Sequence, residues 1–388
     1  MASQSFSLIA SNHAKLSSDV QITPAKVGGS ATGYAIEKYR LQQGLSQGVD
    51  VVEINNGRCV LKILPTRGMG LWDVTVDGVR FGWNSPIRGP VHPSFVPLGE
   101  DSGLGWLDGF DEFMVRCGLE SNGAPEFDEK TGRVKYPLHG RIGNKPAHKV
   151  DVAVDGETGE IKLTGIVEET RFHFLKLRLT TTLKTKVGEP GVRITDEVEN
   201  FSNTEGSFQM LYHVNYGMPL LDGGSRVIVA AEEIVPRNAH AATGIKTWDH
   251  YSAPQTGFEE QVYFLKLRGD ANGRTQALLK NAHGTQGASL LFNTRQLPCF
   301  SVWKDTAGDR DGYVTGLEPG TNFPNPRSFE EQQNRVVKLA SGAKAQLELE
   351  LQFHTKAAEV TAAEAAVNKL AAGKQPKVYT EPQAGWCS

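Results

Sequence analysis

The sequence has few cysteines, no excess of either charge and no long apolar run, and each absence excludes a class of protein. Its four cysteines, Cys59, Cys117, Cys299 and Cys387, form no CxxC pair, which argues against a zinc module or a disulfide framework. There are 41 basic and 44 acidic residues, so charge gives no case for binding nucleic acid or an anionic membrane surface. We expect free thiols, no bound metal, and a neutral or mildly anionic small-molecule ligand.

Signals for the commonest enzyme chemistries and for targeting are also missing. The chain has no phosphate-binding loop, no GxGxxG after a strand, no HExxH and no GxSxG, the patterns of nucleotide-binding proteins, zinc proteases and serine hydrolases. Its first eight residues carry neither a basic nor a continuous apolar segment, and no apolar run reaches membrane-spanning length. We therefore expect a cytoplasmic protein.

What the sequence does have is apolar-polar alternation with period two. It is clearest in residues 346–353 and recurs in 160–167, 176–183 and 192–195, and such alternation is typical of half-buried strands. Turn pairs stand between such segments, namely Asp77-Gly78, Asp155-Gly156 and Asn272-Gly273, and they predict hairpin-type turns.

Helical composition is confined to the tail, where residues 357–372 are rich in Ala, Glu and Lys and Gly373 follows. There is no repeat of fixed period and no obvious linker. We predict an all-β protein, a single large antiparallel β-sandwich over residues 1–355 with its core at about 50–355, few short helices, and a C-terminal helix and tail over 356–388.

One carboxylate stands out as a candidate general base. Glu318 lies in Gly316-Leu317-Glu318-Pro319, which we interpret as a turn directly after a short apolar strand. A fixed acidic side chain at a strand end, with Thr315, Thr321 and Asn322 nearby, suits proton transfer on small polyols. Its candidate partners are His213, which ends the strand 208–212, His139 in Leu138-His139-Gly140, and three further residues, Arg67, Arg116 and Glu259.

In order and spacing these residues resemble the aldose 1-epimerase (galactose mutarotase-like) family. In that family an Arg precedes a Leu-His-Gly segment, a second His follows downstream, then a Gly-Tyr-Asp element, and finally a Glu after Leu. Here Arg116, His139, His213, Glu259 and Glu318 stand in the same order. The likeness covers roughly residues 50 to 355, and its short motifs are specific only jointly.

The resemblance implies a large β-sandwich and an enzyme that interconverts the α and β anomers of a monosaccharide without a cofactor. It implies that His213 is the general acid at the ring oxygen and Glu318 the general base at the anomeric hydroxyl. His139 and Arg116 are expected to hold ring hydroxyls or the ring oxygen region as charged donors, through charge-assisted hydrogen bonds. Glu259 is expected to accept from hydroxyls, and Arg67 to bind an anionic substituent. The protein is expected to act as a monomer or homodimer.

Departures from the family pattern keep other functions open. The family's His-x-Tyr-Phe-Asn segment is here His213-Val214-Asn215-Tyr216-Gly217, and Glu259 replaces an Asp, so the floor of a sugar pocket must differ. The same acid-base pair also suits an isomerase, epimerase or lyase acting on an oxidised sugar, and the fold also suits a non-catalytic carbohydrate-sensing protein. A glycosidase would need a second well-placed carboxylate.

Overall fold

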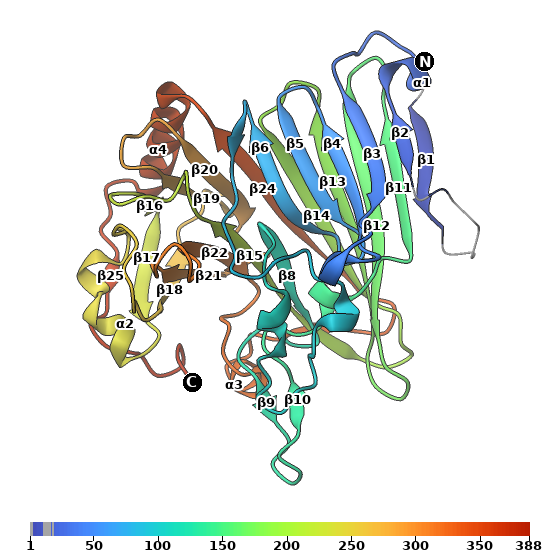
Figure 1. The fold of residues 1–388 in the computed structure, drawn as a ribbon. Helices are drawn as coiled ribbons and strands as arrows, with labels where there is room; N and C mark the ends of the chain where they lie inside the picture. Colours follow the sequence, from blue (N-terminus) through green and yellow to red (C-terminus); the bar gives the residue numbers. More distant parts are fainter. Residues whose placement is uncertain (1–2, 11–16, 18) are drawn as a thin grey trace.

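The protein is built from two large sheets packed face to face, as the computed structural model shows (Figure 1). The structure describes residues 3–10, 17 and 19–388, so Met1 and Ala2, where the expected sandwich begins, lie outside the described residues. Strand pairing is antiparallel in both large sheets, apart from one parallel pair between β17 (Ala231–Pro236) and β25 (Lys377–Val378). The predicted all-β sandwich is therefore confirmed.

The first sheet has nine strands. Their spatial order is β1 (Gln4–Ile9), β11 (Lys149–Val154), β12 (Glu160–Thr170), β13 (Lys176–Lys186), β14 (Gly191–Asn200), β24 (Lys344–His354), β20 (Gly287–Asn293), β19 (Arg274–Lys280) and β16 (Arg226–Val229).

The second sheet has fourteen strands and carries the residues of interest. Its main order is β2 (Val20–Ile22), β3 (Ala35–Arg40), β4 (Asp50–Asn55), β5 (Cys59–Leu64), β6 (Gly70–Val76), β8 (Met114–Leu119), β15 (Gly206–Tyr216), β22 (Val314–Gly320), β21 (Cys299–Asp305), β18 (Gln261–Leu267), β17 and β25. Two short strands pair off this path, β7 (Val79–Arg80) with β6 and β23 (Val337–Leu339) with β15. A separate hairpin, β9 (Glu126–Phe127) with β10 (Val134–Tyr136), projects from the sandwich (Figure 1).

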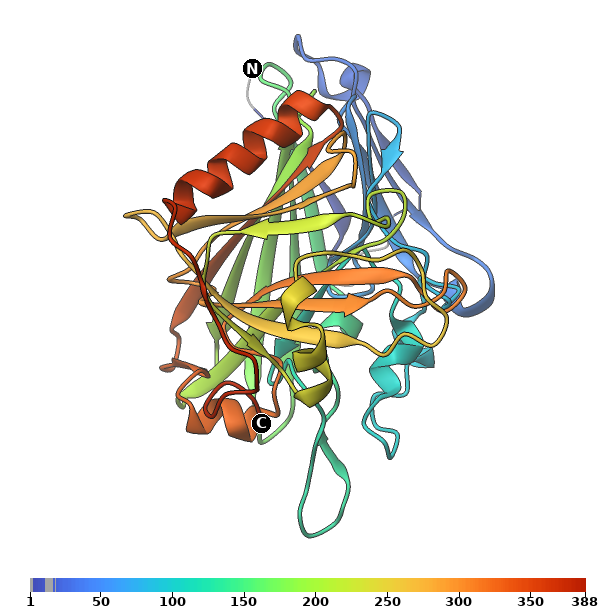
Figure 2. The same ribbon diagram turned by 90° about the vertical axis from the view of Figure 1, so that its left-hand side faces the viewer.

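Helices are short except for the predicted one in the tail. The α-helices are α1 (Pro24–Val27), α2 (Ala239–Thr243), α3 (Arg327–Gln332) and α4 (Ala357–Ala371), and the 3-10 helices are η1 (Gly44–Ser46), η2 (Pro93–Phe95), η3 (Gly105–Gly109), η4 (Ile142–Asn144) and η5 (Ile245–Thr247). In Figure 2, α4 lies across the nine-stranded sheet, where it buries Ala363 and Val367 against Leu278 of β19. Ala372 and Gly373 both have positive φ at its end, as helix termination requires.

The turns expected from the sequence differ in whether the strands on either side of them pair with each other. Asp77 and Gly78 form a two-residue hairpin between β6 and β7, and both have the positive φ that such a turn needs. Asn272-Gly273 also lies in a tight turn, in which the backbone N–H of Gly273 donates to the carbonyl of Asp270 at 2.9 Å, but this turn joins β18 and β19, which belong to different sheets and do not pair. All four cysteines are free, as expected.

Candidate active site

The candidate site lies on the face of the fourteen-stranded sheet that points away from the other sheet. Side chains alternate along β15, so Tyr212 and Val214 join the core between the sheets. Leu211 points the opposite way and packs with Trp106 and Phe110 in a separate cluster. His213 follows the same parity as Leu211, and it therefore projects into this aromatic layer.

Strand register brings His213 and Glu318 together. Because Leu211 pairs with Gly320 and Val214 with Leu317, residue 213 of β15 lies opposite residue 318 of β22. Side chains directly opposite on one face are close neighbours, and Nε2 of His213 is 3.2 Å from Oε1 of Glu318. The expectation that Glu318 sits on a turn after a strand is wrong, since it lies within β22, and His213 likewise lies within β15 rather than at its end.

A missing side chain makes room for this contact. Gly316 precedes Glu318 by two positions on β22 and so shares its face. A Cβ at Gly316 would lie 2.7 Å from Oε1 of Glu318 and 3.0 Å from Cε1 of His213. The glycine is therefore needed for the pair to adopt this geometry.

Asn215 fixes which nitrogen of His213 carries a proton. Its Nδ2 donates to the backbone carbonyl of Glu112 at 3.0 Å, and this bond sets the amide so that Oδ1 faces Nδ1 of His213 at 2.6 Å. An amide oxygen only accepts, so Nδ1 of His213 must be the donor. In a neutral imidazole, Nε2 then has a lone pair directed at Glu318.

Burial biases both members of the pair toward their uncharged forms. Desolvation raises the pKa of Glu318 to about 8, with a further rise from Glu260 that Arg237 partly offsets. Desolvation, and then the neighbouring His139, hold the pKa of His213 well below its usual range, although the hydrogen bond that His213 donates to Asn215 opposes that shift. Near neutral pH the pair therefore holds one proton between Nε2 and the carboxyl group.

His139 is the third polar residue of the site. It stands on a loop with a φ of 55°, and its ring centroid is 5.3 Å from that of His213 and 4.6 Å from that of Trp106. Nδ1 faces the backbone carbonyl of Asn122 at 3.0 Å, so it is the donor. Because desolvation lowers the pKa of His139 to about 4, its Nε2 is an acceptor and not the charged donor that we expected from the sequence.

These three residues lie in a cavity of about 320 Å³, which we call the His213 pocket. Ten of its fifteen lining residues are apolar or aromatic. The rings of Trp106, Phe110 and Trp303 stand around His213 with centroids 6.2, 5.2 and 5.4 Å from its own. Flat apolar faces beside a few polar groups are typical of sites for small ligands.

Two lining residues escaped the sequence analysis. Arg237 follows β17 and Glu260 precedes β18, and they form an ion pair of 3.0 Å while Glu260 also accepts from Nε1 of Trp303 at 2.6 Å. Alternation along the chain puts Glu260 on the face of Val262, which also lines the pocket. This alternation can be seen in the sequence, but the sequence does not show which face of the strand carries the pocket. Nothing in the sequence pointed to Arg237.

Arg116 is buried in the core and does not line the His213 pocket. Its neighbours Val115 and Cys117 belong to the aromatic layer, so alternation turns Arg116 toward the nine-stranded sheet. There its guanidinium binds the carboxylate of Asp196 and, at 2.7 Å, the hydroxyl of Thr181. It has no part in the site proposed below.

Arg67 and Glu259 are also outside the pocket, for opposite reasons. The guanidinium of Arg67 is 1% exposed and is held by the carboxylate of Glu112, by Asn144 and by two backbone carbonyls. The side chain of Glu259 is 75% exposed, and its carboxylate lies 3.6 Å from Nδ1 of His240. Of the six residues predicted from the sequence, the structure thus brings together His139, His213 and Glu318.

Comparison with known proteins adds the family. Residues 46–353 match the family described as Domain of unknown function (DUF4432). The crystal structure of a "putative aldose 1-epimerase" from Klebsiella pneumoniae is 35% identical, with a TM-score of 0.94 over 99% of this chain and 100% of that one. This chain belongs to the DUF4432 family of aldose 1-epimerase-like proteins. No curated protein sequence matches it significantly.

More distant solved structures share the fold of this DUF4432 protein. A galactose mutarotase-like protein from Clostridium acetobutylicum is 14% identical, with a TM-score of 0.56 over 82% of this chain and 98% of that one. Galactose 1-epimerase from Lactobacillus acidophilus is 13% identical, with a TM-score of 0.52 over 83% and 99%. At these identities the likeness shows the galactose mutarotase-like fold alone.

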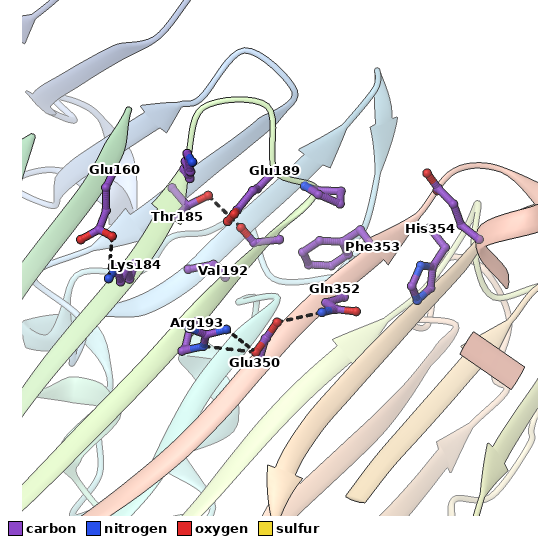
Figure 3. A pocket seen from close by; sticks show the side chains of 14 residues that line it. Glu160, Lys184, Thr185, Glu189, Val192, Arg193, Glu350, Gln352, Phe353 and His354 are labelled. Atoms are coloured by element: carbon purple, nitrogen blue, oxygen red, sulfur yellow. Dashed lines mark hydrogen bonds and ion pairs between the residues drawn. The ribbon is translucent and has the colours of Figure 1, made fainter. Parts of the chain in front are cut away.

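A larger hollow of the DUF4432 protein, about 480 Å³, lies at the ends of β13, β14 and β24 (Figure 3). Four of its charged side chains form two ion pairs, Lys184 with Glu160 at 2.6 Å and Arg193 with Glu350 at 3.0 Å. Such partly exposed pairs contribute little to stability. Among the described residues, no set of three or more His, Cys, Asp and Glu is placed to hold a metal ion, and no helix is long and apolar enough to cross a membrane.

Proposed function

We propose that this protein is a cofactor-independent aldose 1-epimerase that interconverts the anomers of a monosaccharide in the His213 pocket. The observation that carries the proposal is the contact of 3.2 Å between Nε2 of His213 and Oε1 of Glu318, at the floor of a pocket walled by aromatic rings. Anomerisation needs one acid and one base side by side, because the ring oxygen and the anomeric hydroxyl are bonded to the same carbon.

The proton count of the pair suits this reaction. One proton is shared between Nε2 of His213 and the carboxyl of Glu318. When it resides on His213, the imidazolium is an acid and the carboxylate is a base. When it resides on Glu318, the roles are reversed. Both arrangements carry the same total charge, so the pair passes between them without exchanging a proton with solvent.

Ring opening uses the first arrangement. The Glu318 carboxylate takes the proton of the anomeric hydroxyl, the electron pair of that O–H bond forms the C1 carbonyl, and the bond from C1 to the ring oxygen breaks. Nε2 of His213 gives its proton to the ring oxygen as it leaves. Rotation about the C1–C2 bond then exposes the other face of the carbonyl, and the reverse transfers close the ring to the opposite anomer.

The remaining polar groups fit substrate binding. Nε2 of His139 accepts from a sugar hydroxyl, since its Nδ1 already donates to Asn122. The guanidinium of Arg237 and the carboxylate of Glu260 lie on the pocket lining as a bound pair, and together they offer both donors and acceptors to hydroxyls. Trp106 and Trp303 present faces on which the C–H side of a sugar ring stacks.

The test is the rate at which a freshly dissolved α-anomer reaches its anomeric equilibrium, followed by polarimetry or one-dimensional NMR over a panel of hexoses, pentoses and uronates. We expect acceleration by the wild type and its loss, by at least about 100-fold, in Glu318→Gln and His213→Asn. The matched control is Glu259→Gln, an exposed glutamate beside the site, which should retain wild-type activity. No acceleration of any sugar by the wild type would overturn the proposal.

A further inference from the structure

The polar groups of the His213 pocket are gathered into two places. His139, His213 and Glu318 form one group at the floor, with ring centroids of the two histidines 5.3 Å apart. Arg237 and Glu260 form the other, joined at 3.0 Å. No other charged side chain lines this cavity within the described part of the chain.

These groups leave the pocket without net charge. In the part of the chain that the structure describes, Arg237 is the one cationic side chain on the lining, and it is already paired with the carboxylate of Glu260. The His213–Glu318 pair holds one shared proton, and His139 is neutral. A phosphate or carboxylate on the substrate would therefore have to share Arg237 with the carboxylate of Glu260, and it would add an unbalanced negative charge to a partly desolvated site, which is unfavourable.

Much of the remaining perimeter offers no hydrogen bond. Leu104 and Leu107 belong to the segment of η3, and their side chains are 42% and 44% exposed although both line the cavity. Leu138 and Pro125 continue this apolar wall. An apolar wall beside a few polar groups suits a ligand that has an apolar edge.

We propose, building on the function proposed above, that the substrate is an uncharged deoxy sugar whose hydroxyl-free carbon edge lies against the wall formed by Leu104, Leu107, Pro125 and Leu138. An aldohexopyranose carries hydroxyls at most positions around its ring. After its anomeric hydroxyl and ring oxygen engage Glu318 and His213, its other four hydroxyls would still surround the ring, and any that faced this wall would meet only leucine and proline side chains.

A 6-deoxyhexose matches this apolar wall better. It has three hydroxyls besides the anomeric one, and its methyl group gains from contact with leucine side chains. A hydroxymethyl group in that place would instead lose its bonds to water without replacement. Single-group differences of this kind change kcat/KM by roughly tenfold or more.

The experiment compares matched sugars that differ only at C6, with anomer exchange measured by NMR and divided by each sugar's uncatalysed rate. The pairs are D-fucose with D-galactose, L-rhamnose with L-mannose, and 6-deoxy-D-glucose with D-glucose. In at least one pair we expect kcat/KM to favour the deoxy sugar by tenfold or more. D-Galacturonate and D-galactose 6-phosphate should be slower than D-galactose.

Two variants test whether the leucine wall causes the preference for deoxy sugars. The double substitution Leu104→Asn and Leu107→Asn provides amide groups of nearly the same size on partly exposed side chains, and it should reduce the deoxy-to-hexose ratio at least threefold. Leu45→Asn is the control, because Leu45 is equally exposed, at 46%, and does not line the pocket. It should leave the ratio unchanged.

The outcomes separate the two proposals. Acceleration of all sugars with no preference for the deoxy member of any pair, or with a preference for charged sugars, overturns this inference and leaves the epimerase function standing. A deoxy preference that the double variant does not alter overturns the assignment of the leucine wall. No acceleration of any sugar overturns the epimerase function, and this inference with it.

Discussion

Nδ1 of His213 lies 2.6 Å from Oδ1 of Asn215, two residues along the same strand, and this contact sets the tautomer of the candidate acid. Replacing Asn215 with Leu removes the one hydrogen-bond partner that this nitrogen has among the described residues, while keeping a side chain of similar volume. The ring is then free to adopt the tautomer in which Nε2 carries the proton permanently. We expect kcat for anomer exchange to fall about 10- to 100-fold with little change in KM, because positioning is lost and not substrate contact.

The pH profile provides a second test of the shared proton. Below its pKa of about 8, Glu318 retains the proton that the pair needs, and above it the pair loses that proton and its acid. The pKa of His213 lies well below its usual range, so a second proton arrives only at low pH. We expect kcat/KM to be level from pH 6.5 to nearly 8 and to fall about tenfold per pH unit above. A profile that falls below pH 6.5 instead would contradict this assignment.

Gly316 provides a test of geometry without any change in a polar group. A methyl group at this position would lie 2.7 Å from the Glu318 carboxylate and 3.2 Å from the ring of Trp303, so the flexible carboxylate must move away from His213. Gly316→Ala should therefore reduce kcat/KM by about 100-fold while the protein remains folded by circular dichroism. Gly99→Ala is the control, since a methyl group there meets no atom within 4 Å, and wild-type activity is expected for it.

The sequence predicted the sandwich because period-two alternation depends only on which residues face the core, and the strands obey it. Residues 346–353 lie within β24 and residues 176–183 within β13. It also predicted His213, Glu318 and His139 as a set, through their order along the chain. It did not predict that His213 and Glu318 are opposite each other in adjacent strands, because register depends on pairing between segments about a hundred residues apart.

The misplaced residues have a physical explanation as well. A polar residue in an apolar strand can equally be a ligand-binding group or one member of a buried ion pair. Arg116 is the second kind, because its partner is Asp196 in the other sheet. Glu259 and Glu260 are adjacent and chemically alike, yet alternation sends only Glu260 to the pocket. The position of Arg116 and the difference between Glu259 and Glu260 both depend on which face of a strand is turned toward the pocket, and the sequence alone does not show this.

The buried pair of Arg116 and Asp196 should stabilise the fold without affecting substrate affinity. Arg116→Met leaves the Asp196 carboxylate buried, with the hydroxyl of Tyr212, at 2.9 Å, as its one remaining side-chain partner among the described residues. We expect the free energy of unfolding to fall by about 3–5 kcal/mol, measured by chemical denaturation, with KM of the folded fraction unchanged. Arg141→Met, which breaks a partly exposed pair with Glu120, should cost less than about 1 kcal/mol. A rise in KM for Arg116→Met at unchanged stability would restore Arg116 as a substrate-binding residue.

Glu318 should also impose a cost on stability that depends on pH. Its pKa is raised in the folded protein to about 8 from a usual value of 4.5, so the folded state binds the proton more tightly than the unfolded state. The cost is absent below pH 4.5, grows as pH rises toward 8, and is constant above. Glu318→Gln removes it, and its free energy of unfolding should exceed that of the wild type by up to about 3 kcal/mol at pH 7 and by nearly nothing at pH 4.5. Thermal unfolding at both pH values, with the exposed Glu259→Gln as control, measures the difference. An advantage of Glu318→Gln that is equal at the two pH values would mean that the substitution acts through packing and not through the buried charge.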